Sequence, residues 1–439
     1  MEPVALIAFA GLCLYACTRP AVALAVVTLM FPLEIVLQAL SPMLRNSGLG
    51  LKAVNIAVGS TALLAVVGVV VKNPGRVSDL ARPMPMVTYA MFAWSAVTLL
   101  WSPGAESGLE SIVGQLPYLV VTLILAPLLL RSIDDYGDTV SASIVIVGGL
   151  CAIVVVSPEF VVKDSRLGFE LGVATRSNPL ALGEMGGLGI ILGVLARNST
   201  LGAWAVPLRL AAILLGAAVA IQSGSRGQFF YALAIALVFL PLAAPIANFK
   251  NFALTVGFVA FVVVGSYVLL GSLLFGVAEK RFSIEGLLYG SSSSQTRIEN
   301  VLSLASAWAG RPFAWVAGLG FYAFNGLFAD SGNIYSHVLF ADMIFEEGIP
   351  GTLLFTAFVF MATRACFTLF NGVSQVAIPR SSAAVLIGLY AYQTLLVNKQ
   401  GNLWGSTYYF LYGLLLVEFS RLETSERSTS ALDGQFASS

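Results

Sequence analysis

Charged residues are scarce in this sequence. The 439 residues include 23 acidic and 23 basic side chains, so 10% of the chain is charged, whereas a soluble globular protein is about 25% charged. Hydrophobic residues make up 58% of the chain. This composition excludes a soluble enzyme, a disordered regulator and a nucleic-acid-binding module, and the net charge of zero gives no general attraction to polyanions. The sequence predicts a polytopic membrane protein.

Histidine and cysteine are also rare. A single histidine, His337, excludes a multi-histidine metal site, and the sequence has no acidic cluster that would suit a carboxylate site. The four cysteines lie inside apolar runs without a metal-ligand spacing, so we expect neither a bound metal nor disulfides. No basic region precedes the first apolar stretch, so we expect no cleavable signal peptide.

Apolar stretches recur along the whole chain. At roughly 20 residues per span, we expect an all-α fold of about 12–13 transmembrane helices, at 4–17, 21–39, 53–71, 86–101, 113–130, 140–157, 180–196, 207–222, 229–244, 252–276, 350–370, 383–397 and 404–420. Only Thr18-Arg19-Pro20 separates the first two stretches, which therefore form either a helical hairpin or one broken helix. Ionisable side chains within the spans are few, namely Glu34 and Glu184.

The distribution of Lys and Arg among the short loops predicts the orientation. The loop at 72–85 has three basic residues, so we assign it to the cytoplasm. Alternation then places the turn at 223–227, the long loop at 277–338 and the loop with Lys399 outside. Two other outside loops carry basic residues against this rule.

These assignments divide the chain into four parts. We expect N-terminal transmembrane helices at 1–276, one large extracytoplasmic loop with short helices at 277–338, C-terminal transmembrane helices at 339–420, and a Ser/Thr-rich cytoplasmic tail at 421–439 that is disordered. No other non-membrane segment is as long, so chemistry on the outer side is expected in the loop at 277–338.

Two arginines on the outer side are candidates for binding an anion. Arg226 lies between two apolar spans with no proper loop, where an arginine costs a few kcal/mol unless it is paired or reaches water. It is either an interfacial anchor or an anion ligand at the start of the next helix. Arg297 precedes a predicted helix at 298–309, with Thr296 as its cap. It is either a surface ion-pair partner of a nearby glutamate (Glu279 or Glu299) or a second anion ligand.

The single histidine is the third candidate. His337 ends the long loop, and histidine titrates near neutral pH unaided; alone, it is more often a hydrogen-bonding residue than a base. Together, the three side chains are the parts needed to break a sugar–diphosphate bond without metal. Arginine binds phosphate oxygens bidentately, and a general base contributes about 10²–10⁴-fold, or roughly 3–5 kcal/mol.

Three stretches resemble the O-antigen ligases and related O-antigen polymerases of bacterial cytoplasmic membranes. They are Ser223-Gly224-Ser225-Arg226-Gly227, then Thr296-Arg297 followed by Ala307-Trp308, Gly310-Arg311-Pro312 and Gly318-Leu319-Gly320-Phe321, and finally Ser336-His337 followed by Glu346-Glu347-Gly348-Ile349-Pro350-Gly351. Trp101-Ser102-Pro103 is a weaker likeness. The firm part covers about 215–365. Val338 is a departure, because the family often has asparagine there.

The resemblance implies a GT-C-like integral-membrane glycosyltransferase with a large periplasmic loop and no cofactor. Such an enzyme transfers a glycan from undecaprenyl diphosphate to lipid A–core (a ligase) or to another repeat unit (a polymerase). The essential arginines of the family would map to Arg226 and Arg297, and the essential histidine to His337. Arg176 and Arg311 are further substrate-binding candidates, near the expected acceptor surface.

Ligase activity is our first expectation, and polymerase activity is the alternative. In both, the arginines would hold the diphosphate while His337 deprotonates the acceptor hydroxyl for an inverting displacement. A secondary transporter or lipid exporter is a different class, although no repeat relates the two halves and a carrier does not need so long a loop. A non-catalytic scaffold for polysaccharide assembly is the fourth interpretation.

Overall fold

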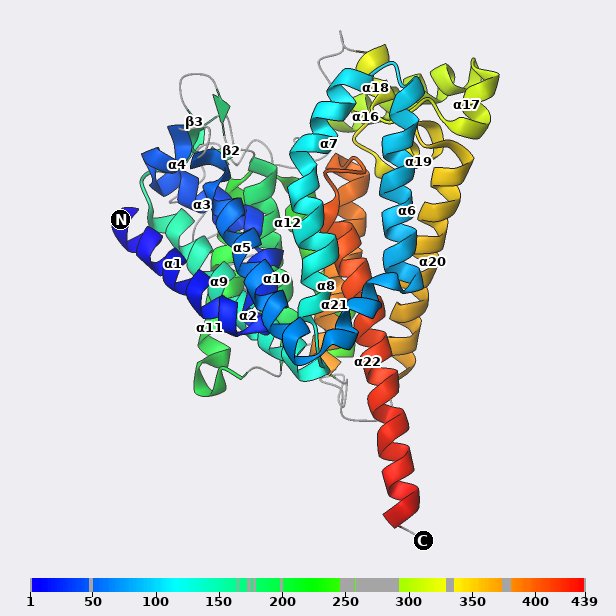
Figure 1. Cartoon of the computed structure of the whole chain (residues 1–439). Coiled ribbons are helices and arrows are strands. Elements are labelled where there is room, and N and C mark those ends of the chain that lie inside the picture. Colours follow the sequence, from blue (N-terminus) through cyan, green and yellow to red (C-terminus); the bar gives the residue numbers. More distant parts are fainter. Residues whose placement is uncertain are drawn as a thin grey trace.

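The computed structural model is a bundle of helices whose long axes run between two ends of the molecule (Figure 1). It describes residues 2–46, 50–163, 166–171, 175–176, 179–197, 200–244, 257, 292–328, 335–372 and 380–437. In the described residues, nine α-helices precede the first strand pair: α1 Glu2–Thr18, α2 Pro20–Thr28, α3 Met30–Leu40, α4 Pro42–Asn46, α5 Gly50–Lys72, α6 Pro83–Thr98, α7 Ala105–Leu119, α8 Ala126–Leu129 and α9 Ile133–Val156. A 3-10 helix, η1 Pro74–Ala81, lies between α5 and α6.

The remaining helices include most of those at the upper end in Figure 1. They are α10 Pro179–Leu195, α11 Ala205–Gln222, α12 Arg226–Ala243, α16 Ser292–Ala309, α17 Pro312–Ala317, α18 Ala323–Leu327, α19 Leu339–Phe345, α20 Gly348–Gly372, α21 Arg380–Gln400 and α22 Thr407–Ala437. Short single turns lie at Leu99–Trp101 and Gly202–Trp204, and a π-helical stretch, η3, at Val120–Leu125. Helix α22 includes much of the segment 421–439 for which the sequence predicts disorder.

Two small antiparallel hairpins lie between α9 and α10. Strand β1 (Val161–Lys163) pairs with β2 (Arg166–Gly168), and β3 (Glu170–Leu171) pairs with β4 (Thr175–Arg176). The described part of the chain is otherwise almost entirely helical, as expected for an all-α polytopic membrane protein.

Seven described helices are long and apolar enough to cross a membrane: Lys52–Lys72, Pro83–Trp101, Ala105–Leu129, Ile133–Val156, Gly202–Gln222, Arg226–Ala243 and Gly348–Asn371. The pair α2 and α3 is an eighth if it counts as one span, and it bends by 69°. The chain breaks at the predicted Thr18-Arg19-Pro20, where α1 ends and α2 begins, and it breaks again between α2 and α3 at Leu29. The predicted span at 252–276 lies outside the described residues.

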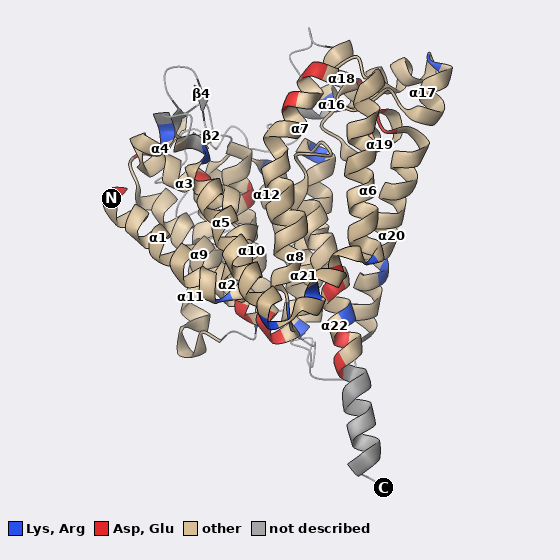
Figure 2. Ribbon diagram, in the orientation of Figure 1, with Lys and Arg blue, Asp and Glu red and all other residues tan. Residues whose placement is uncertain are grey.

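Charge and exposure both fit a membrane protein. Lys, Arg, Asp and Glu gather toward the two ends of the bundle, and the middle is almost free of them (Figure 2). Only 28% of the apolar window in Gly348–Asn371 is buried within the chain. Large apolar side chains such as Leu353, Phe360 and Phe367 therefore face outward, as lipid-facing side chains do.

Small residues allow the central helices to pack closely. A Cβ at Gly186 of α10 would lie 2.4 Å from the Gly216 carbonyl oxygen of α11, and one at Gly193 would lie 2.8 Å from the Arg209 carbonyl oxygen. Close backbone approach through glycine is the usual way in which membrane helices associate. The backbones of α10 and α11 therefore pack closely below the junction of α11 and α12.

The connections alternate between the two ends as the hydropathy pattern predicts. In Figure 1, η1 and the start of α9 lie at the lower end, whereas the α11–α12 junction, α16 to α19 and the end of α21 lie at the upper end. The three candidate residues Arg226, Arg297 and His337 are therefore carried by segments at the same end of the bundle.

Candidate functional site

Arg226 is the first residue of α12, directly after a tight junction with α11. Gly224 occupies the left-handed region at φ +66°, which glycine adopts without a steric penalty. Ser223 Oγ accepts a hydrogen bond from the Ser225 N–H (3.2 Å) and donates to the Ala220 carbonyl (2.7 Å). The small residues around Arg226 thus have a specific purpose, since they let two membrane helices meet with Arg226 half-buried at their upper end.

Arg297 lies inside α16, not at its start. The helix begins at Ser292, so the predicted boundary at 298 and the predicted cap at Thr296 are wrong. A serine-rich stretch is compatible both with a loop and with the beginning of a helix, so its composition does not mark the boundary. Arg297 is half-buried, and in the described part of the chain it forms no ion pair with Glu299. Glu279 lies outside the described residues.

His337 lies in the short connection before α19, with φ +69°. A positive φ is uncommon for a residue other than glycine and needs support from its surroundings. Ser336 Oγ provides it by donating to the buried Asp342 carboxylate (2.5 Å) and accepting from the Val338 N–H (3.0 Å). The Tyr335 ring lies edge-on to the imidazole, with ring centroids 4.4 Å apart. These contacts hold the backbone on either side of His337, and the Tyr335 ring packs against the imidazole.

Lys399 is a further cation at this end that sequence reasoning did not single out. It lies in the last turn of α21, beyond the apolar stretch at 383–397. Its Nζ donates to Gln228 Oε1 (2.8 Å), and a Cβ at Gly227 would lie 2.2 Å from that Nζ. Gly227 thus leaves the space that Lys399 occupies beside the start of α12. In the sequence, the glycine directly after Arg226 is the signal that a side chain could pack there. The fold is needed to show that this side chain is Lys399.

These side chains affect one another electrostatically. We name Arg226, Arg297 and Lys399 the cationic cluster. Burial lowers the pKa of Lys399 to about 8, together with the positive charges of Arg297, Arg226 and, from β2, Arg166. Burial also lowers the pKa of His337, and Arg297 lowers it further. At neutral pH, His337 is therefore mostly an uncharged base, while like charges crowd around Lys399.

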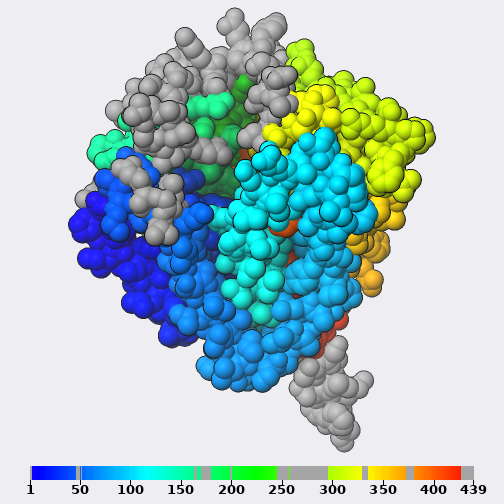
Figure 3. Space-filling model, turned by 45° about the horizontal axis from the view of Figure 1, so that its top comes forward, coloured from blue at the N-terminus to red at the C-terminus, as the bar shows by residue number. Residues whose placement is uncertain are grey.

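The pKa of Arg297 is lowered by burial and raised by the Tyr231 hydroxyl of α12. Arg226, Arg297 and Lys399, from three separate helices, are therefore close enough to act on one another electrostatically. Figure 3 shows this end of the molecule, where green atoms lie at depth beside α7, which is drawn in cyan. An anion that enters here would meet converging positive charge.

A hydrogen-bonded frame supports the segment that carries Arg297 and His337. Trp101 Nε1 donates to the Gly318 carbonyl (3.2 Å), and the buried Glu346 carboxylate accepts from the Phe324 N–H (2.8 Å). A Cβ at Gly318, where φ is +80°, would lie 2.0 Å from the Glu346 carbonyl oxygen. Several motif residues in the family resemblance therefore serve to build the frame, without themselves lying in the cationic cluster.

The structure places one of the two further substrate-binding candidates, Arg311, away from the cluster. Arg311 is exposed and precedes α17, which lies at the outer edge of the molecule, away from α12 (Figure 1). The spacing of Arg311 from Arg297 in the sequence does not show in which direction the chain runs after α16. The backbone of Arg176 pairs with Glu170 in the second hairpin, and its side chain is outside the described part of the structure.

No group of three or more His, Cys, Asp or Glu side chains is placed to hold a metal ion in the part of the chain that the structure describes. The amino-acid sequence matches no protein-family model and no curated protein. The arrangement of the residues is thus the basis for assigning a function.

Proposed function

We propose that this protein is an integral-membrane glycosyltransferase of the O-antigen ligase type. It would act in a bacterial cytoplasmic membrane, with the cationic cluster facing the periplasm, within a GT-C-like fold of about 12–13 helices. The donor would be a glycan on undecaprenyl diphosphate, and the acceptor a sugar hydroxyl of lipid A–core. The observation that supports this proposal most is that Lys399 fills the space beside Gly227, directly after Arg226, and bonds to Gln228. Arg297 and the half-buried His337 are carried by segments at the same end of the bundle.

In this scheme, the cationic cluster binds the diphosphate of the donor. Arginine offers a planar fork that matches two phosphate oxygens, and lysine adds a point charge. The half-buried positions strengthen these interactions, because the surrounding dielectric is lower than that of water. A lipid diphosphate lies at headgroup level, which is where the start of α12 would lie in a bilayer.

The transfer itself needs one base and one leaving group. His337 takes the proton of the acceptor hydroxyl, whose oxygen attacks the anomeric carbon. The bond between that carbon and the diphosphate oxygen breaks, the configuration inverts, and undecaprenyl diphosphate leaves with one more negative charge. The cations offset this developing charge and thereby favour the transition state. No metal takes part in any step.

The proposal is tested with purified protein in lipid nanodiscs, supplied with an undecaprenyl-diphosphate glycan and EDTA, with or without lipid A–core. We expect glycan on lipid A–core from the wild type and none from His337→Ala. Product that needs an added divalent cation, or wild-type product levels from His337→Ala in the folded state, would contradict the mechanism.

Polymerase activity is the alternative within the same chemistry, since only the molecule that brings the hydroxyl differs. Longer glycan–lipid formed without lipid A–core would identify a polymerase. The donor, the cationic cluster and the role of His337 would then stand, and the acceptor assignment would change.

One observation favours a second function, that of a transporter. Glu34 of α3 and Glu184 of α10 line the same cavity, of about 330 Å³, together with Phe31 and Tyr408. Ionisable groups at membrane depth often mark a substrate or proton path. A transporter would move a labelled lipid-linked glycan across the membrane of proteoliposomes without forming a new glycosidic bond. Glu184→Gln should abolish this movement.

A further inference from the structure

A second cavity, of about 360 Å³, lies beside the cationic cluster. It is bounded by α7, α10, α21 and the turn before α22, and by Tyr322 and Tyr335 at the upper end. Its size is in the range of small-molecule sites. Its lining is rich in side-chain amides and hydroxyls, among them Ser111, Gln115, Gln393, Gln400, Asn402 and Ser406.

The cavity and the cluster share a wall. Gln400, which lines the cavity, accepts a hydrogen bond from Gln228 Nε2 (2.6 Å). The oxygen of the same Gln228 amide accepts from Lys399 (2.8 Å). On another side, the cavity is lined by Tyr335, whose ring contacts His337. A group that extends from an anion held by Lys399 would therefore lie next to this cavity.

The chemistry of the lining differs from that of the cluster. No Lys, Arg or His lines the cavity in the described part of the chain, and Glu184 is its one carboxylate. That carboxylate already accepts a hydrogen bond from Gln393 Nε2 (2.6 Å). Amides and hydroxyls both donate and accept, and the rings of Phe31 and Tyr408 offer apolar faces. Such a lining suits a neutral ring that carries several hydroxyl groups.

We propose that this cavity binds the sugar that is joined directly to the diphosphate of the donor. This inference rests on the proposed function, because it assumes that the cluster holds the diphosphate. The donor sugar is favoured over the acceptor sugar because one covalent bond joins it to the diphosphate. It must therefore lie next to the Lys399–Gln228 pair, which forms the shared wall.

Gln393 is the most informative residue for a test. Its side chain is buried at 4% exposure and is oriented by Glu184. Gln393→Leu keeps the approximate volume and removes the amide. Gln38 offers a matched control, since its Nε2 donates to Glu34 Oε1 (3.0 Å) in the same type of pair but in the neighbouring cavity. Gln115→Leu, on α7, is a second variant should Gln393→Leu fail to fold.

The experiment compares binding of two probes to the protein in nanodiscs: undecaprenyl diphosphate alone, and undecaprenyl diphosphate carrying one N-acetylglucosamine. We expect Gln393→Leu and Gln115→Leu to weaken binding of the sugar-bearing lipid by about tenfold, the effect of one or two lost hydrogen bonds. Their affinity for undecaprenyl diphosphate should not change, and Gln38→Leu should bind both probes as the wild type does.

Other outcomes separate this inference from the proposed function. Equal affinity of the wild type and Gln393→Leu for the sugar-bearing lipid, or an equal loss for both probes, overturns the sugar site while the diphosphate site stands. A rise in the KM for lipid A–core alone would place the acceptor in the cavity and also overturns the inference. If the wild type binds neither probe, the proposed function fails and the sugar site fails with it.

Discussion

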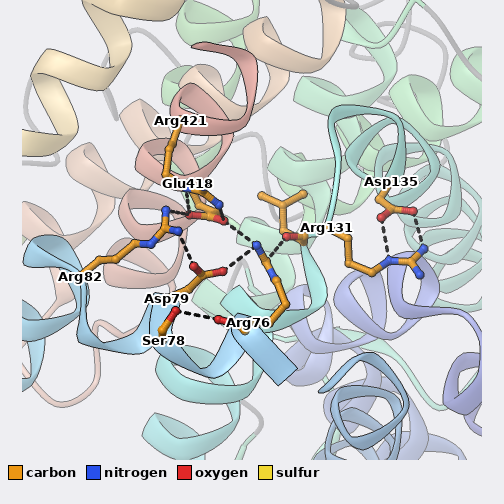
Figure 4. A network of polar contacts seen from close by, with 10 residues as sticks. Arg76, Ser78, Asp79, Arg82, Arg131, Asp135, Glu418 and Arg421 are labelled. Atoms are coloured by element: carbon orange, nitrogen blue, oxygen red, sulfur yellow. Dashed lines mark hydrogen bonds and ion pairs between the residues drawn. The ribbon is translucent and has the colours of Figure 1, made fainter. Parts of the chain in front are cut away.

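Arginines gather at both ends of this protein, but in opposite surroundings. At the lower end, Arg76 contacts Asp79 (2.7 Å) and Glu418 (2.9 Å), and Arg421 contacts Glu418 (2.6 Å). Figure 4 shows these side chains, with Arg82, pointing toward the two carboxylates. At the upper end, Arg226, Arg297 and Lys399 lie close enough that the arginines lower the pKa of the lysine.

The difference separates charge that serves the fold from charge that serves a ligand. Buried ion pairs fix the position of their partners, and removing one partner is strongly destabilising. Crowded like charges do the reverse, because each disfavours the charged form of its neighbours. An anion that binds to such a cluster offsets this mutual repulsion. The comparison therefore predicts that lower-end variants lose stability and upper-end variants lose activity.

The largest effect is expected at His337. His337→Ala removes the base, so we expect glycan transfer to fall by about 10²–10⁴-fold. His337→Gln keeps a polar side chain without a basic nitrogen and should lose as much. The measurement is initial transfer rate per folded molecule in nanodiscs, with melting temperature as the control. If His337→Gln retains the wild-type rate, the side chain acts as a hydrogen-bonding group and not as the base.

At the lower end, Glu418→Gln should destabilise the protein by up to about 3 kcal/mol. Among the described residues, the change leaves Arg76, whose side chain is 9% exposed, with Asp79 as its remaining anionic partner. Chemical denaturation measures this loss, and transfer per folded molecule should stay unchanged. Asp135→Asn is the matched control: its partner Arg131 is 41% exposed, so the cost should stay below about 1 kcal/mol. Equal costs for the two variants would contradict the assignment.

Exchange of arginine for lysine sharpens the comparison further. Arg297→Lys should slow transfer by about 10–100-fold, because an ammonium group cannot bind two phosphate oxygens in one plane. Arg82→Lys, at the lower end, is the control: that side chain is 33% exposed and its pairing with Asp79 is mainly a matter of charge, so activity should not change. Normal transfer by Arg297→Lys would exclude a bidentate grip.

The contribution of Lys399 to donor binding can be tested at Lys399 itself and at Gly227, which leaves space for it. Lys399→Gln should raise the donor KM by about tenfold, since one charge on the diphosphate is lost. Gly227→Ala should raise it as well, because the new Cβ displaces the end of a flexible lysine side chain. The double variant should be no worse than Lys399→Gln. Additive effects would mean that Gly227 acts independently of Lys399.

The sequence alone predicts the helical membrane fold and the sharing of one end by Arg226, Arg297 and His337, because hydropathy and alternation depend only on local pattern. It does not predict that Lys399 joins them. Its contact with Gln228 spans 171 residues, and no periodicity relates two such distant helix ends. The start of α16 was also missed, because serine suits both loops and first turns.

The smallest expected effect is on pH dependence, where the same comparison acts through titration. The pKa of His337 is lowered by burial and by Arg297, so the acidic limb of kcat/KM should lie below the ordinary histidine value of about 6.5. Arg297→Gln removes a positive charge and should move that limb to higher pH.

As pH rises through about 8, Lys399 loses its proton, so donor affinity should decline, and Lys399→Gln should abolish that decline. Neither limb should respond to Glu418→Gln at the opposite end. A shift in that variant would mean that the two ends are coupled through the helices, and the division between fold charges and ligand charges would no longer hold.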